Sequence, residues 1–117
     1  MPVMEGKAVL LERLAGVNGV PILLGERDVE RFVEVVKAIA PTFAAINLED
    51  VAAPDCFEIE RRLEASLEIP VMHDDQHGTA VVVLASLLNA CRLAKISLLD
   101  QVVGIIEIGR ASCRERV

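Results

Sequence analysis

Two pairs of adjacent acidic residues are the first candidates for chemistry in this sequence. Glu49-Asp50 follows the apolar segment 43–48, and Asp74-Asp75 follows the short apolar segment 69–72. In an open parallel sheet, ligands bind beyond the carboxyl ends of the strands, so loops that follow different strands can meet at one site. Four carboxylates repel each other unless a cation lies among them, and hard oxygen ligands suit Mg²⁺ or Mn²⁺. The alternative is that these residues are solvated or cap the helices that follow them.

Lys7 is a candidate general base. It lies in the segment Met4–Ala8, which we expect to form the opening turn of a helix, where the positive end of the helix dipole disfavours an ammonium. A nearby metal ion would further favour the neutral amine, whereas an adjacent carboxylate would favour the charged form. The alternative is an ordinary surface lysine.

Three further polar residues flank the second acidic pair. His73 and His77 can coordinate a metal or move protons, but their spacing of four across a predicted loop favours polar loop roles over ligation. Thr79 follows Gly78 where a helix is expected to begin. Its hydroxyl can cap that helix, and the free N–H groups there can hold an anion, of which we favour capping.

The elements that must position these residues alternate between helices and short apolar strands. Helices are predicted at 4–15, at 29–39 after Asp28, from Pro54 onwards and from about 78 to 94, and strands at 20–24, 43–48, 69–72 and 102–106. The last helix is apolar nearly all round, which predicts that it is buried between layers. This alternation indicates parallel pairing with right-handed crossovers, so we expect an α/β fold with an open, mainly parallel sheet.

Composition excludes several function classes. The chain has 117 residues, a net charge of −6 and no cluster of basic residues, which disfavours a nucleic-acid partner. Cys56, Cys91 and Cys113 have neither disulfide nor metal-ligand spacing, which favours a reducing cytoplasm. The start of the chain shows no secretion signal. The longest apolar run, Ala80–Leu88, is well short of the ~20 apolar residues that span a bilayer, so we predict a soluble protein without a membrane partner.

The segment 107–117 does not fit the rest of the sequence. It is polar and rich in arginine, and it directly follows a predicted buried strand without turn chemistry. A back-translation of this segment resembles a common sequencing-library adaptor read in frame. We therefore expect that these residues are a non-native tail and that Cys113 has no functional role.

Several motifs, taken in order, resemble the malic enzymes of the bacterial type. The similarity extends through residues 2–106. The motifs that carry it are Pro2–Leu10, Ile39–Phe43, Ile46–Asp50, Pro54 with Cys56–Glu60, and His73–Ala80. The resemblance implies the N-terminal substrate- and metal-binding domain of a malic enzyme over residues 1–98. It further implies the first strand of a Rossmann-type NAD(P)-binding domain over residues 99–106.

The resemblance also implies a reaction and residues that carry it. Malic enzymes convert malate to pyruvate and CO₂ while they reduce NAD⁺ or NADP⁺. The residues that bind their divalent cation, Mg²⁺ or Mn²⁺, correspond to Glu49, Asp50 and Asp75. The cation would polarise the C2 oxygen of malate. Lys7 would accept the proton of the C2 hydroxyl, and Asp74 would orient Lys7. Thr79 is the expected contact to the nucleotide cofactor, and the full-length enzyme is expected to be a homo-oligomer.

The sequence departs from the malic enzyme pattern in two respects. It contains no tyrosine, so the catalytic tyrosine of the family is absent. A glycine-rich dinucleotide turn should follow residues 102–106, but the segment Glu107–Arg110 has one glycine where GxGxxG needs three. We therefore predict that the isolated chain is inactive. The alternative function is a stand-alone module that binds a divalent metal or a small anion without redox chemistry.

Overall fold

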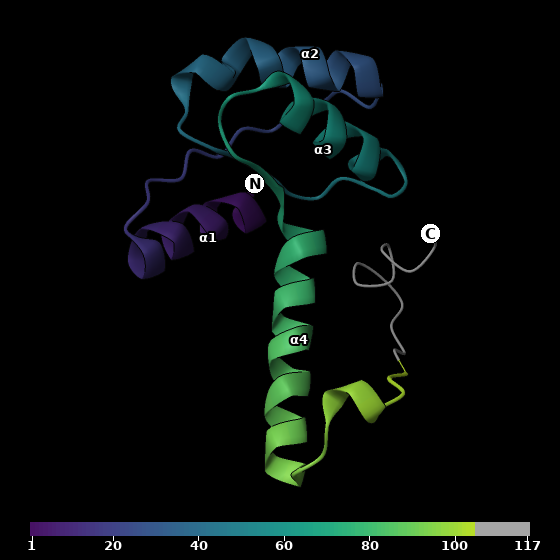
Figure 1. The fold of residues 1–117 in the computed structure, drawn as a ribbon. Coiled ribbons are helices and arrows are strands. Elements are labelled where there is room, and N and C mark those ends of the chain that lie inside the picture. The colour runs from purple at the N-terminus through teal and green to yellow at the C-terminus, as the bar shows by residue number, and fades with distance from the viewer. Residues whose placement is uncertain (105–117) are drawn as a thin grey trace.

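The computed structural model describes residues 1–104 as a body of packed helices from which one long helix projects (Figure 1). The element order is α1 (Pro2–Leu10), η1 (Leu11–Ala15), α2 (Val29–Ile39), η2 (Ala40–Thr42), β1 (Ile46–Leu48), α3 (Asp55–Ser66), β2 (Val71–His73), α4 (Asp74–Ala94) and η3 (Leu98–Asp100). The predicted tail 107–117, Cys113 and the last two residues of the predicted strand 102–106 lie outside the described residues.

The core forms where α2 and α3 pack over the two strands. Apolar residues recur at helical spacing on α2 and α3, so each helix turns one apolar side toward the other. The buried cluster consists of residues from both helices and from β1, namely Val33, Val36, Leu48, Ile59 and Leu63. The start of α2 is set by Asp28, whose Oδ1 accepts a hydrogen bond from the Arg31 N–H at 3.0 Å. The predicted helix 29–39 and its cap are confirmed.

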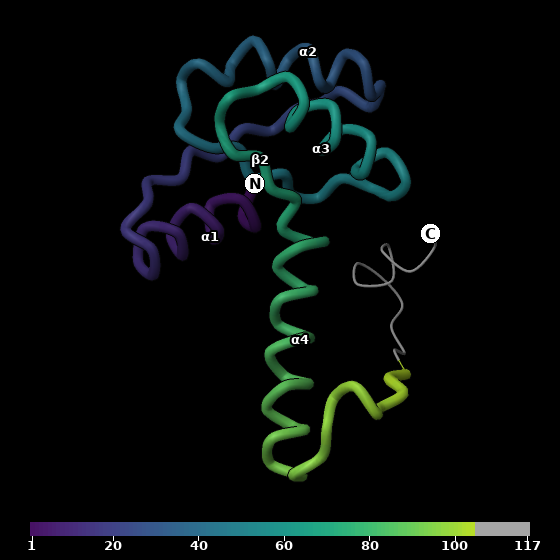
Figure 2. The backbone as a smooth tube through the Cα atoms, viewed as in Figure 1, coloured from purple at the N-terminus to yellow at the C-terminus, as the bar shows by residue number. Residues whose placement is uncertain are grey.

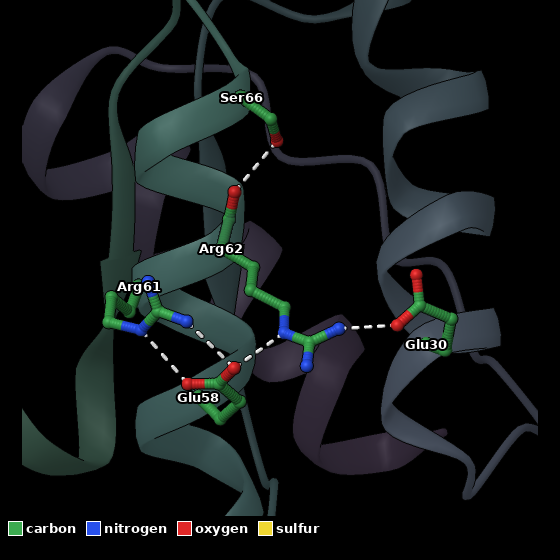
Figure 3. Close-up of polar contacts among 5 residues, drawn as sticks. All are labelled: Glu30, Glu58, Arg61, Arg62 and Ser66. Carbon is green, nitrogen blue, oxygen red and sulfur yellow. Dashed lines mark hydrogen bonds and ion pairs between the residues drawn. The ribbon is translucent and has the colours of Figure 1, made fainter.

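Polar side chains also join α2 to α3 at the surface (Figure 3). Arg62 of α3 donates from Nε to Glu58 Oε1 at 2.6 Å and from Nη1 to Glu30 of α2, while Arg61 binds the same Glu58. These two guanidinium groups lower the pKa of Glu58 to about 2. Exposed pairs of this kind contribute little to stability individually. The buried apolar cluster is therefore the main attachment between the two helices.

The sheet of the described chain has two strands. β1 and β2 pair in parallel, with Ile46 opposite Val71 and Leu48 opposite His73. The predicted α/β class with parallel pairing is confirmed, although both strands are shorter than the segments predicted for them. β2 leads directly into α4, as the tube in Figure 2 shows.

The helix predicted at 4–15 starts earlier and changes its winding. It runs as an α-helix over Pro2–Leu10, continues as the π-helical turn η1, and ends at Gly16, whose φ of +66° is left-handed. Glycine adopts this conformation without the steric penalty of a Cβ atom, so its predicted role at the helix end is confirmed.

Two predicted strands are absent from the described residues. Residues 20–24 run as a coil without strand pairing, and so do residues 102–104, where Val102 is fully exposed. The apolar composition of both segments suggested buried strands. A strand forms only where a neighbouring strand pairs with it, and β1 and β2 pair only with each other within the described chain.

The prediction that the last helix begins near Gly78 and is buried between layers is wrong for the structure described. α4 begins at Asp74, and Cys91 is its one buried residue. Its apolar side chains are largely exposed, since its main neighbours among the described elements are the short elements β2 and η3. By length and composition α4 is also apolar enough to cross a membrane, with a mean hydropathy of 1.4 over its most apolar stretch. These two properties do not distinguish a spanning helix from one that packs against other protein.

Candidate functional site

Strand register brings the two acidic pairs to the same edge of the sheet. Leu48 and His73 are partners at the ends of two parallel strands, and the next residues along the chain are Glu49 and Asp74. The side chains that follow the two strands therefore lie beside each other at the carboxyl edge. This is the placement expected from the sequence.

Lys7 joins both strand ends. Its Nζ lies 2.9 Å from Glu49 Oε2 and forms a second ion pair with Asp74 Oδ2. The Glu49 side chain is only 4% exposed, whereas the Lys7 side chain is 34% exposed. One amine thus connects α1 to the ends of β1 and β2, and its open side faces solvent.

The position of Lys7 within its helix differs from the prediction. α1 begins at Pro2, and Lys7 lies in its last turn instead of its first. Lys7 thus lies beyond the first turn, where the positive end of the helix dipole acts, so the predicted effect of the dipole on its amine is wrong. The amine lies instead between the carboxylates of Glu49 and Asp74.

These residues line a cavity of about 1190 Å³. Lys7, Glu49, Asp50 and Asp74 form one charged part of its lining, and Glu26, Arg27 and Asp55 are its other charged residues. Most of the remaining lining is apolar, from α1, the coil that follows it, β1 and α2. Ligand sites commonly have this character, with a few polar groups in an otherwise apolar hollow. The cavity leaves room for a small carboxylic acid beside the amine.

The other predicted site residues lie close by in sequence but contribute differently. Asp50 is exposed and has a φ of 109°. The Asp75 side chain is 13% exposed, and its Oδ2 lies 3.8 Å from Nε2 of the buried His73. Thr79 lies in the second turn of α4 instead of at its start, so the prediction that it caps the helix is wrong.

The predicted metal ligands do not form a metal site in this arrangement. Among residues 1–104, no group of three His, Cys, Asp or Glu side chains is placed to hold a metal ion. The oxygen donors of Glu49, Asp50 and Asp75 suit Mg²⁺ or Mn²⁺ by type, but Glu49 is paired with the Lys7 amine. Metal binding by this set stays a prediction.

Glu60 is a buried carboxylate next to the site for which the sequence predicted no role. Glu60 of α3 is 6% exposed, and its Oε1 accepts hydrogen bonds at 2.8 Å from the His73 N–H and from His77 Nε2. It therefore holds the junction of β2 and α4, from which Asp74 and Asp75 project. The available signal was its helical spacing from Cys56 and Leu63, which puts Glu60 on the buried face of α3.

Known proteins are similar to this chain in both sequence and fold. The sequence profile of the malic enzyme N-terminal domain matches residues 25–64. The chain is 57% identical over 111 residues to the NAD-dependent malic enzyme 1 of Bacillus subtilis, a match that covers 95% of this chain and 25% of that protein. The crystal structure of a malic enzyme from Pyrococcus horikoshii matches with a TM-score of 0.81 and 55% identity, over 85% of this chain and 23% of that one. Over most of its length the chain is therefore similar to malic enzymes in both sequence and fold.

Malic enzymes with either nucleotide preference are among the relatives. The NADP-dependent malic enzyme of Escherichia coli is 50% identical over 99 residues, which is 85% of this chain and 13% of that protein. The chain spans about a quarter of the length of the first Bacillus relative. The family similarity and the fold expected from the sequence are thus confirmed. The assignment of residues 1–98 and 99–106 to two domains stays a prediction.

Proposed function

We propose that this chain is the part of a malic enzyme that binds malate and moves the proton of its C2 hydroxyl. The proposed overall reaction is the oxidative decarboxylation of malate to pyruvate and CO₂, linked to NAD⁺ or NADP⁺. The observation that carries the proposal is the Lys7 amine, held between Glu49 and Asp74 at the edge of a parallel sheet in a chain similar to malic enzymes.

Lys7 has two tasks in this proposal. Malate is a dianion, so the ammonium attracts one of its carboxylates into the cavity. The amine can accept the C2 hydroxyl proton only after the ammonium has released one of its own protons to the solvent on its open side and has separated from one of its two carboxylates. Glu49 is the partner we expect it to leave, because Asp74 is more exposed and can move with the amine.

The nicotinamide nucleotide is the second reactant. When bound, it accepts the hydride from C2 of malate. The names of the relatives support both NAD⁺ and NADP⁺ as candidates. Contact between Thr79 and the nucleotide belongs to this proposal.

A chimera tests the proposal directly. Residues 2–104 would replace the matching segment of the Bacillus subtilis malic enzyme, and formation of NADH from malate would be followed by absorbance. We expect turnover by the chimera and no turnover by the 117-residue chain alone. A chimera that folds and binds NAD⁺ but does not oxidise malate would contradict the proposal.

Matched lysine variants separate the role of Lys7 from general effects of charge. In the chimera, Lys7→Ala should lower kcat by about 10²- to 10⁴-fold, the usual contribution of a general base. Lys37→Ala removes the same charge from the exposed side of α2 and should leave kcat unchanged. Equal activity of the two variants would exclude Lys7 as the base.

A further inference from the structure

The two carboxylate oxygens of Asp74 have different neighbours. Oδ2 forms the ion pair with Lys7, and Oδ1 lies over the backbone of Gly78, one turn further along α4. A Cβ atom at position 78 would lie 2.6 Å from Oδ1 and 3.5 Å from Cγ of Asp74. The space that the carboxylate occupies therefore exists because residue 78 has no side chain.

The conformation of Gly78 gives no other reason for a glycine. It lies inside α4 without a positive φ, where alanine is the more stable residue. The atom that a Cβ would meet is the end of a side chain, so the helix could accept alanine if Asp74 moved aside. Such a substitution would therefore displace the Asp74 side chain and disturb its contact with Lys7, while the helix itself would stay intact.

We propose that Gly78 is a positioning residue that keeps the Asp74 carboxylate directed at Lys7. It acts through Asp74 and touches no reacting atom. The proposal depends on the proposed function only for its consequence in catalysis, since the contact itself is a property of this chain.

The test compares Gly78→Ala with Gly6→Ala in the 117-residue chain. Gly6 also lies in a helix, next to Lys7, but a Cβ there would meet nothing within 4 Å. Both variants should raise the melting temperature, because alanine replaces glycine in a helix. Only Gly78→Ala should disturb the Lys7–Asp74 contact.

The contact is read from the rate at which Lys7 is acetylated by an activated ester, measured by mass spectrometry. Lys37 and Lys95 are the other lysines of the chain and serve as internal references. Asp74→Ala removes the contact and sets the upper limit of the rate. We expect Gly78→Ala to raise the relative rate of Lys7 several-fold, toward that limit, while Gly6→Ala leaves it at the wild-type value.

Each outcome decides the proposal. If Gly78→Ala folds and its Lys7 is acetylated at the same relative rate as in wild type, the proposal is overturned. If Gly78→Ala fails to fold, the double variant Asp74→Ala with Gly78→Ala is measured: a folded double variant supports action through Asp74, and an unfolded one shows a structural role and overturns the proposal. The rate is read without malate or nucleotide, so an inactive chimera leaves this result untouched.

Discussion

Glu60 on α3 and His73 at the end of β2 are joined by a hydrogen bond of 2.8 Å between the buried Oε1 and the backbone N–H. The same oxygen accepts from His77 Nε2 of α4, also at 2.8 Å. One buried carboxylate therefore links a helix of the core, the last residue of a strand and the first turns of the projecting helix. The site residues Asp74 and Asp75 lie between the two histidines that Glu60 binds.

Removal of this carboxylate should destabilise the fold. Glu60→Ala leaves the buried His73 N–H without its acceptor, which costs about 1–3 kcal/mol in the free energy of unfolding. Glu60→Gln retains an acceptor oxygen and should lose less. Urea unfolding measures both, with the exposed Glu64→Ala on the same helix as the control. Equal stability of Glu60→Ala and Glu64→Ala would show that the buried bonds do not matter.

The parts of the fold that could be predicted from the sequence are those decided by local signals. The cap at Asp28 and the apolar spacing on α2 specify a helix whatever surrounds it. Gly16 ends its helix in the left-handed conformation that glycine favours. The pairing of β1 with β2 followed from the order of elements, and it places Glu49 and Asp74 side by side.

The parts that could not be predicted depend on partners distant in the sequence. Residues 20–24 have the composition of a strand, but no neighbouring strand pairs with them in the described chain. The start of α4 at Asp74 was missed because its N-cap, His73, makes no side-chain capping bond. Glu60 appeared as one charge among several on α3, and only the packing of β2 against that helix shows that it is buried.

Acid should lower the stability of the fold, in part because Glu58 becomes protonated. Arg61 and Arg62 lower the pKa of this carboxyl from its ordinary value of 4.5 to about 2 in the folded chain. A lowered pKa means that the stabilisation is fully present above pH 4.5 and is lost as the pH falls toward 2. The difference in stability between wild type and Glu58→Gln should therefore shrink across that interval.

The pH series needs two controls. Glu34→Gln changes an exposed glutamate of α2 and should show no comparable trend over the same interval. Added salt should reduce the difference between wild type and Glu58→Gln at pH 6, because the pair with the arginines is exposed. A difference that stays constant from pH 6 to pH 2 would be incompatible with the lowered pKa of Glu58.

The exposed apolar side chains of α4 should make the described chain bind hydrophobic dyes. Val81 and Val82 are 67% and 65% exposed, so replacing them with glutamine removes apolar surface without opening a cavity. We expect Val81→Gln and Val82→Gln to keep the unfolding free energy within about 0.5 kcal/mol and to lower the fluorescence of a bound dye. Calorimetry and dye titration measure the two effects.

A buried leucine provides the contrast for α4. Leu63 is fully buried in the core, and Leu63→Ala should cost about 2–5 kcal/mol. If the valine variants lost as much stability as Leu63→Ala, the helix would be packed against protein in solution, contrary to its exposure in the structure.

The ion pair between Lys7 and Glu49 should oppose binding of a divalent cation. The ammonium lies 2.9 Å from Glu49 Oε2, so a cation at that carboxylate is repelled by Lys7 or must displace it. Lys7→Met removes this charge and retains an unbranched side chain of similar length. Even at the bulk-water value for unit charges, the repulsion of about 1 kcal/mol predicts a Kd for Mn²⁺ that is at least roughly fivefold lower than in wild type.

Electron paramagnetic resonance of free Mn²⁺ measures this affinity in the 117-residue chain without malate or nucleotide. Lys37→Met removes an equal charge from an exposed residue of α2 that does not line the cavity, and it corrects for the change in net charge. Glu49→Gln in the Lys7→Met background should abolish the gain, since it removes the carboxylate that Lys7 had occupied. If Lys7→Met binds Mn²⁺ no better than Lys37→Met, the amine and the metal do not compete, and Glu49 is not a metal ligand in this chain.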